Sequence, residues 1–237
     1  MSTDTMTQFD TDLAQYQAQQ QKTAEDMAQL NANANSATTM MDAINLLYEM
    51  MDCIGDTLVG YADVLNMLTD GTNATAQAEN DFAGMMSSAI DDPDQCADYC
   101  SDYVNQINSI ETMTQQLQDT GAIDSSTADT ILNSCQNIED SFGDDWGNPT
   151  AMAGDMNTWM TDAENNGGTY PAQINDIQQA QQQIETSFSS LTQTEQYKVQ
   201  EEVTVEQNLA STCSATQNSW SSMTSQMTRN QMTQMTS

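Results

Sequence analysis

The residue types that could do chemistry are few, and the closest pair of thiols is Cys96 and Cys100. Because they are four residues apart, the two thiols would lie on one face of a helix, where thiolates could hold a metal ion. Closing a tetrahedral site would need two further ligands from elsewhere in the chain. We therefore interpret the pair as packed or occasionally oxidised thiols, and we expect no metal site here.

The chain has no histidine, and this narrows the possible catalytic chemistry. Histidine is the usual base beside a serine or cysteine nucleophile and a common ligand of catalytic zinc. There is also no glycine-rich phosphate loop and no pair of acids at a spacing typical of acid–base catalysis. We expect no catalytic residue and no cofactor, and hence no enzyme activity.

An acidic run could attract a divalent cation, although its spacing is unlike that of a calcium loop. It lacks the alternating Asp/Asn ligands, the central glycine and the closing glutamate of such a loop. Carboxylates near the positive end of a helix dipole explain the run better, as a solvated helix start. The run consists of Asp91, Asp92, Asp94, Asp98 and Asp102.

The net charge of the chain indicates which classes of binding partner are to be expected. Thirty-five acidic residues and three cations, Lys22, Lys198 and Arg229, give a formal charge of −32. Nucleic-acid binding draws its affinity from clustered cations, so we expect neither nucleic acid nor an anionic membrane as a partner. We interpret the acidity mainly as self-repulsion that favours solubility, with a specific basic partner as the alternative.

The N-terminal sequence MSTDTMTQFDTD has neither a cationic start nor an apolar core, so it does not predict a cleavable signal peptide. No apolar run approaches 18 residues, and we expect no membrane span. The five cysteines are odd in number and lack the spacing of a disulfide scaffold, which favours buried thiols in a chain made in a reducing cytosol. If the protein is secreted or reaches the cell surface, as its Gln-, Asn-, Ser- and Thr-rich composition suggests, it uses a route without a cleavable signal.

Hydrophobic periodicity predicts a long helix at the N-terminus. Steps of alternately four and three residues from Phe9 to Leu65 meet apolar residues at fourteen of seventeen positions. This is the a/d pattern of a coiled-coil seam. We expect one helix over about residues 5 to 69, ending at Asp70 and Gly71 because glycine suits a helix C-terminus.

A second long helix is predicted after Pro171, because neither glycine nor proline follows it. Its seam shifts phase between Leu191 and Val199 and then weakens toward the end of the chain. We expect residues about 171 to 235 to pack antiparallel against the N-terminal helix as a hairpin, with Leu65 near Ile174.

Turn signals in the middle of the chain predict shorter helices over about 74–90, 94–118, 126–142 and 150–164. Ser125 or Ser126 is the expected N-cap of the third. The predicted fold class is all-α: a long helix over 1–71, a helical middle domain over 72–170 and a long helix over 171–237.

Eighteen methionines are the most unusual feature of the composition. Methionine usually fills irregular gaps in a core. Adjacent pairs such as Met40–Met41, Met50–Met51 and Met85–Met86 point to neighbouring faces of a helix, however. One member of each pair therefore has two interpretations: ordinary core, or a position that faces a partner subunit. The candidate self-assembly residues are Trp220, Met223, Met227, Met232 and Met235 near the C-terminus and Phe9, Leu13 and Tyr16 near the N-terminus.

Two heptad-patterned terminal helices around a less regular middle give the chain a resemblance to a known class of secreted protein. The Lys-poor N-terminus and the polar C-terminal stripe, LTQTEQYKVQEEVTVEQNLASTCSATQNSW followed by the methionine-rich end, add to it. The layout resembles the extracellular filament, tip and translocator proteins of bacterial type III secretion systems, especially the EspA-like class. The resemblance implies terminal helices that pair as a coiled coil, polymerisation into a tube, and a dedicated cytosolic chaperone. The middle of this chain is longer and more acidic than in short members of that class.

Two other functions fit the same layout. One is a secreted effector or surface protein that binds a host protein through its helices without polymerising. The other is a cytosolic coiled-coil scaffold. Filaments would favour the first interpretation, and a stable small oligomer would favour either alternative.

Overall fold

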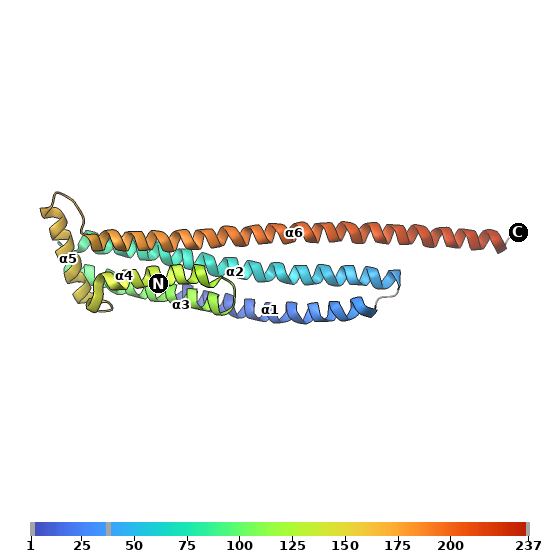
Figure 1. The fold of residues 1–237 in the computed structure, drawn as a ribbon, viewed down its shortest axis with the longest axis horizontal. Helices are drawn as coiled ribbons and strands as arrows, with labels where there is room; N and C mark the ends of the chain where they lie inside the picture. Colours follow the sequence, from blue (N-terminus) through green and yellow to red (C-terminus); the bar gives the residue numbers. More distant parts are fainter. Residues whose placement is uncertain (1–2, 37–38, 236–237) are drawn as a thin grey trace. The chain divides into compact units, whose positions relative to one another are not determined.

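A computed structural model describes residues 3–36 and 39–235 of the chain (Figure 1). Within these ranges every regular element is a helix and no strand occurs. The all-α prediction is therefore confirmed. The chain divides into two compact units, which we call unit 1 (Met1–Ala14 and Val64–Glu195) and unit 2 (Gln15–Asp63 and Gln196–Ser237).

The N-terminal half forms two helices, α1 (Thr3–Ser36) and α2 (Met40–Ser88), so the prediction of one helix over residues 5 to 69 is wrong. The polar sequence before α2 is rich in Asn, Ser and Thr, which favour caps and turns over helix interiors. Thr39 begins α2 by a reciprocal pair of hydrogen bonds with Asp42: its side chain accepts from the Asp42 amide at 3.1 Å, and its own amide donates to the Asp42 carboxylate at 2.8 Å.

Gly71 does not end a helix, and here too the prediction is wrong. Helix α2 continues through it to Ser88. A Cβ atom at position 71 would overlap the ring of Phe188, so this glycine allows α2 to lie close to that ring. The predicted domain boundary at residue 72 accordingly falls inside α2.

The remaining helices are α3 (Pro93–Asp119), α4 (Ser125–Phe142), the 3-10 turn η1 (Gly143–Asp145), α5 (Pro149–Asn165) and α6 (Ala172–Met235). The predicted ranges of α3, α4 and α5 are each correct to within one residue. The predicted cap of α4 is wrong by a residue or two, since Asp124 is the N-cap and accepts from the Thr127 amide at 2.9 Å. Helix α6 confirms a long helix after Pro171.

Unit 1 has a continuous apolar core. It combines the N-terminal turns of α1, the second half of α2, the first part of α6 and all of α3, α4 and α5, with α5 lying across one end of the bundle (Figure 1). Full burial of one large apolar side chain stabilises a fold by about 1.5–3 kcal/mol. The largest side chains with no appreciable exposure are Tyr103, Phe9, Phe188, Met67, Leu68, Met85, Ile107, Ile110, Met113, Leu117, Ile131 and Ile138.

Helices α2 and α6 are antiparallel within unit 1, and two contacts give their register. Gly71 lies against Phe188, and the Gln181 amide donates to the Ala78 carbonyl at 3.4 Å. In this register Leu65 lies near the Glu195 end of the α6 segment and not beside Ile174, contrary to the predicted placement. The difference arises because α2 continues for nearly five more turns after Gly71, to Ser88.

Unit 2 contains the rest of α1, the first half of α2 and the second part of α6. Its buried apolar residues are few, namely Ile44, Cys53 and Cys213. A hydrogen bond from the Gln217 amide to the Tyr48 hydroxyl, at 2.6 Å, joins α6 to α2 here. Three helices share this small core, so unit 2 has much less apolar burial than unit 1.

Candidate functional site

The two thiols that could form a metal or redox site lie in the core of unit 1. Cys96 and Cys100 are fully buried on α3, and the Cys96 thiol donates to the Met85 carbonyl at 3.5 Å. The hydrogen bond with Cys96, together with burial, raises the pKa of Cys100 above that of an ordinary thiol. All five cysteines are free and buried. These thiols are therefore shielded from solution.

The acidic run at the start of α3 is exposed, and its clearest role is to cap that helix. Asp92 is the N-cap and accepts from the Gln95 amide at 3.1 Å, as the interpretation of a helix start requires. In the part of the chain that the structure describes, no three His, Cys, Asp or Glu side chains are grouped so as to hold a metal ion.

One cluster of charged side chains occurs in unit 2, between α1 and α2. The Lys22 ammonium contacts the Asp56 carboxylate at 2.6 Å, and this hydrogen bond lowers the pKa of Asp56. The adjacent Asp26 shares a hydrogen bond with Asp56, which raises the pKa of Asp26. These groups line an open cavity of 600 Å³ together with Glu49 and Asp52. Lys22 and Asp52 are exposed and the other three acids are half-buried, and the acids of the cluster are partly balanced by one lysine.

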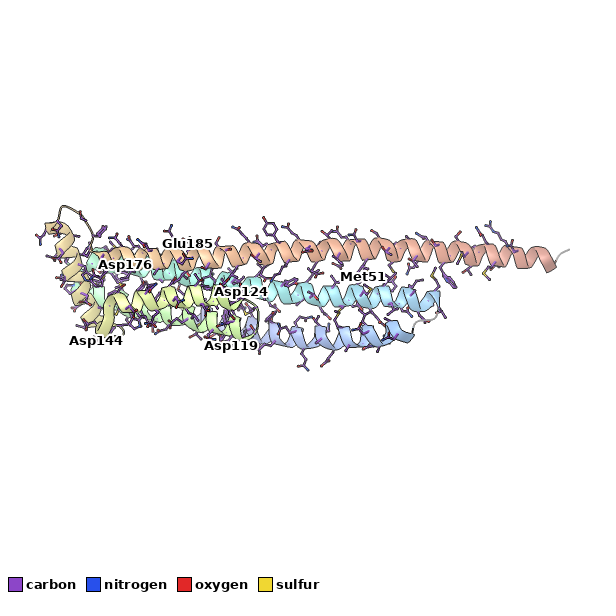
Figure 2. The ribbon with its side chains drawn as sticks, in the orientation of Figure 1. Met51, Asp119, Asp124, Asp144, Asp176 and Glu185 are labelled. Atoms are coloured by element: carbon purple, nitrogen blue, oxygen red, sulfur yellow. The ribbon has the colours of Figure 1, made fainter. Side chains whose placement is uncertain are left out.

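Charge is divided unevenly between the two units. Unit 1 contains twenty-five of the thirty-five acidic residues and no lysine or arginine, whereas all three cations belong to unit 2. The acids of unit 1 are spread over it, with Asp119 and Asp124 near one end and Asp144 near the other (Figure 2). In unit 2, residues 27–41 and 207–237 contain no acidic residue at all.

The predicted self-assembly residues do not form one group. Phe9 is fully buried in unit 1, so its side chain is not at the surface, and Leu13 of the same unit is half-buried. Tyr16 is half-buried in unit 2. Trp220, Met223 and Met227 are exposed by 38%, 49% and 64%. The side chains of Met232 and Met235 lie outside those that the structure describes.

Sequence reasoning missed several exposed apolar side chains of unit 2, although the methionine pairs gave a signal for two of them. Met41 and Met50 are exposed while Met40 and Met51 are half-buried, which fits a partner-facing member in these two pairs. In the third pair Met85 is buried and Met86 is half-buried, so neither member is exposed. The other exposed large apolar side chains in this unit, besides those already named, are Met27, Tyr48, Val59, Tyr197 and Val205.

A groove of 370 Å³ lies between α1 and α2 in unit 2, and we call it the α1–α2 groove. Gly60 forms part of its floor, since a Cβ atom there would lie 3.7 Å from the Tyr16 ring. Asp56 is the charged residue of its lining. The full lining is Tyr16, Gln19, Gln20, Thr23, Ala24, Met27, Asp56, Thr57, Gly60 and Tyr61.

Helix α6 continues past the point where α2 can accompany it. Gln217 contacts Tyr48, and α2 begins only eight residues before Tyr48, at Met40. Figure 1 shows α6 extending beyond the start of α2. We call residues 217–235 the α6 extension. Every side chain described in it, from Gln217 to Asn230, is exposed.

The exposed face of the α6 extension continues a buried seam. Cys213 is buried against the other helices of unit 2, and two steps of seven residues from it reach Trp220 and Met227. Residues seven apart lie on nearly the same face of a helix, so these three side chains belong to one stripe. The stripe therefore leaves its intramolecular partners while it is still apolar.

Comparisons with known protein families, with curated protein sequences and with solved structures found no significant match. Among the described residues, none of the helices is long and apolar enough to cross a membrane. The arrangement that the structure offers for function is the apolar surface of unit 2, made of the α6 extension and the α1–α2 groove.

Proposed function

We propose that this protein is a structural, self-associating protein: a secreted subunit of an extracellular helical filament or needle-tip structure of a secretion system. Its function in this proposal is assembly through its own helical surfaces, and it performs no catalysis. The finer arrangement, two long helices paired as a coiled-coil hairpin around a smaller helical domain, belongs to the same proposal.

The observation that supports assembly best is the exposed seam of the α6 extension. Trp220 and Met227 continue the stripe of the buried Cys213, yet both are exposed. An isolated helix of this length is only marginally stable in water, because nucleation is costly and little surface is buried. A neighbouring chain that covered the stripe would bury these side chains at about 1.5–3 kcal/mol for each large one.

The distribution of charge favours the same end of unit 2 as the place where copies meet. Two copies that approached through unit 1 would bring together surfaces with many carboxylates and no cation. Residues 207–237 contain one charge, Arg229, and no acid. Copies can therefore approach there with the least repulsion.

A partner that keeps the subunit unassembled follows from the same surface. A chain with exposed methionines and a tryptophan associates as its concentration rises, so it needs a cover until it is exported. We propose a cytosolic chaperone for this role and export without a cleaved signal peptide, as the resemblance to secreted filament proteins implies.

Light scattering at rising protein concentration, followed by electron microscopy, tests the proposal. The full chain is expected to form species that grow with concentration, whereas a chain without residues 219–237 is expected to stay helical by circular dichroism and to stop associating. Loss of helicity throughout the truncated chain would instead make this segment part of the fold. Unchanged association would show that it has no role in assembly.

Substitutions separate the role of this surface from a general effect of apolar exposure. The pair Met223→Gln and Met227→Gln is expected to weaken association strongly. The control is Tyr170→Ser, since Tyr170 is 40% exposed but belongs to unit 1. An equal loss of association in both variants would contradict a specific role for the α6 extension.

The charge of unit 1 favours one alternative, a secreted effector or surface protein that binds a host protein through its helices without polymerising. Twenty-five carboxylates with no cation fit a basic protein surface. A single small species at all concentrations, together with salt-sensitive binding to a basic protein, would support this alternative over assembly.

A further inference from the structure

We infer that the α6 extension of one copy occupies the α1–α2 groove of a second copy, in a head-to-tail contact. The inference rests on the proposed self-assembly and adds which two surfaces meet. Both surfaces belong to unit 2, and a contact between two different surfaces can be repeated from copy to copy.

The shape of the α1–α2 groove suits an apolar helix stripe. Its two walls are adjacent helices, and Tyr16, Met27 and Tyr61 supply apolar surface to its lining. Gly60 keeps the floor open, because any larger side chain would extend toward the Tyr16 ring. A volume of 370 Å³ is enough for one or two large side chains, such as those of methionine or tryptophan.

The α6 extension matches this groove in length. Trp220 and Met227 are seven residues apart, about 10 Å along a helix. The groove follows α1 from Tyr16 to Met27, eleven residues or about 16 Å. Both side chains of the stripe can therefore enter the groove together.

The charge of the α6 extension also suits the acidic lining of the α1–α2 groove. The α6 extension has no acidic residue and contains Arg229, while the groove is lined by Asp56, which is hydrogen-bonded to Asp26 and paired with Lys22. An approaching segment of typical composition for this chain would bring further carboxylates to these acids and be repelled. The α6 extension lies within residues 207–237, the longest acid-free segment of the sequence, so it is the segment of a second copy best suited to this position.

The occupant must come from another copy. Helix α6 is unbroken through Met235, and its extension leads away from the start of α2 (Figure 1). To reach the groove of its own chain the extension would have to reverse direction, which needs a break in the helix. Repetition of the contact between different copies gives an open polymer where the rotation between copies does not close into a ring, as the proposed filament requires.

Disulfide trapping between two differently tagged full-length variants tests the contact. One variant has Met227→Cys, and the other has Thr23→Cys in the groove. The matched control replaces Thr23→Cys by Ala18→Cys, which is exposed on the same helix but does not line the groove. The native cysteines are buried and should not compete. The expected result is a mixed-tag dimer with Thr23→Cys and about tenfold less of it with Ala18→Cys.

The outcomes separate this inference from the proposed function. Association in solution with equal trapping at both positions, or with no trapping, overturns the docking in the groove and leaves self-assembly standing. A dominant dimer of Met227→Cys with itself also overturns it, since the extensions would then pair with each other. A chain that stays monomeric at all concentrations overturns both.

A pair of glycine variants in α2 provides a second test without cysteines. Gly60→Leu fills the groove and is expected to weaken self-association about tenfold or more. Gly55→Leu, on the same helix, has no atom within 4 Å of its Cβ position and does not line the groove, so it should leave association unchanged. Circular dichroism confirms that each variant is folded. Equal association in the two variants would overturn the inference.

Discussion

Unit 1 and unit 2 are built from some of the same helices, yet they distribute apolar and charged side chains in opposite ways. Unit 1 buries a continuous core, and among the large apolar side chains that the structure describes in it only Ile90 and Tyr170 are exposed. Among its described side chains, unit 2 buries three apolar residues and exposes ten large ones. Unit 1 nevertheless has twenty-five of the acids, and unit 2 has all of the cations.

This difference indicates that unit 1 mainly stabilises the fold, whereas unit 2 mainly offers surface for association. A highly charged surface over a full core keeps copies apart and stabilises the fold within one chain. An apolar surface over a small core leaves burial to be gained from another chain. We therefore expect changes in unit 1 to affect stability and changes in unit 2 to affect association.

Truncation of one aromatic residue in each unit gives the largest expected contrast. Phe188→Ala removes a fully buried ring of unit 1 and should lower the free energy of unfolding by about 3–5 kcal/mol. Trp220→Ala, at an exposed position of unit 2, should change it by less than about 0.5 kcal/mol in the unassociated chain. Urea unfolding at low concentration, followed by circular dichroism, measures both. Similar losses would mean that Trp220 is buried in solution.

Replacing one glycine of α2 in each unit by alanine compares the effect of a single added methyl group on the stability of the two units. Gly71→Ala forces a Cβ atom against the buried Phe188 ring, which should destabilise unit 1 by about 1–3 kcal/mol. Gly55→Ala in unit 2 meets open space and should stabilise the helix by about 0.5–1 kcal/mol. Thermal unfolding distinguishes the signs. If Phe188→Leu fails to restore stability to Gly71→Ala, the ring is not the cause.

The response to pH should also differ between the units. Burial raises the pKa of Asp70, Glu79, Asp81 and Glu111 in unit 1 above ordinary carboxyl values. These groups are ionised at pH 7, and in that form they lower the stability of the fold. Because their pKa values are higher in the folded than in the unfolded chain, the folded chain takes up protons first as the pH falls, and stability increases. The melting temperature of unit 1 should therefore rise between pH 7 and about pH 5.

The control for this pH effect lies in unit 2. The hydrogen bond from Lys22 lowers the pKa of Asp56, so any stability from this pair is present at pH 7 and is lost only as the pH falls through the lowered pKa of Asp56. Glu111→Gln should reduce the rise seen for unit 1. A melting temperature that falls steadily from pH 7 would contradict the assignment of burial as the dominant cause.

Of these tests, a change in salt concentration should produce the smallest difference in melting temperature between the units. Raising NaCl from about 0.05 to about 0.5 M shortens the screening length to under about 5 Å. Repulsion among the carboxylates of unit 1 weakens, so its melting temperature should rise slightly. The exposed contact of Lys22 with Asp56 gives unit 2 no comparable gain. A larger shift for unit 2 than for unit 1 would reverse the comparison.

Part of the proposed assembly surface could be predicted from the sequence. The exposure of Trp220, Met223 and Met227 follows from a stripe of apolar residues among neutral polar ones, too polar to form a core by itself. The α1–α2 groove could not be predicted, because it depends on Gly60 lying against Tyr16, forty-four residues earlier in the chain. No local pattern indicates that contact.

By itself the sequence determined the all-α class and the ends of α3, α4 and α5. These depend on local physics: the φ angle of proline, the turn conformations of glycine and the capping side chains of aspartate and asparagine all act within a few residues. The tertiary structure decided the rest. Gly71 lies inside α2 and packs against the Phe188 ring, where a Cβ atom would overlap the ring. Phe9 is buried because residues distant in the sequence cover it. The packing of both residues is stabilised by partners that are far away in the sequence, and hydrophobic periodicity does not identify those partners.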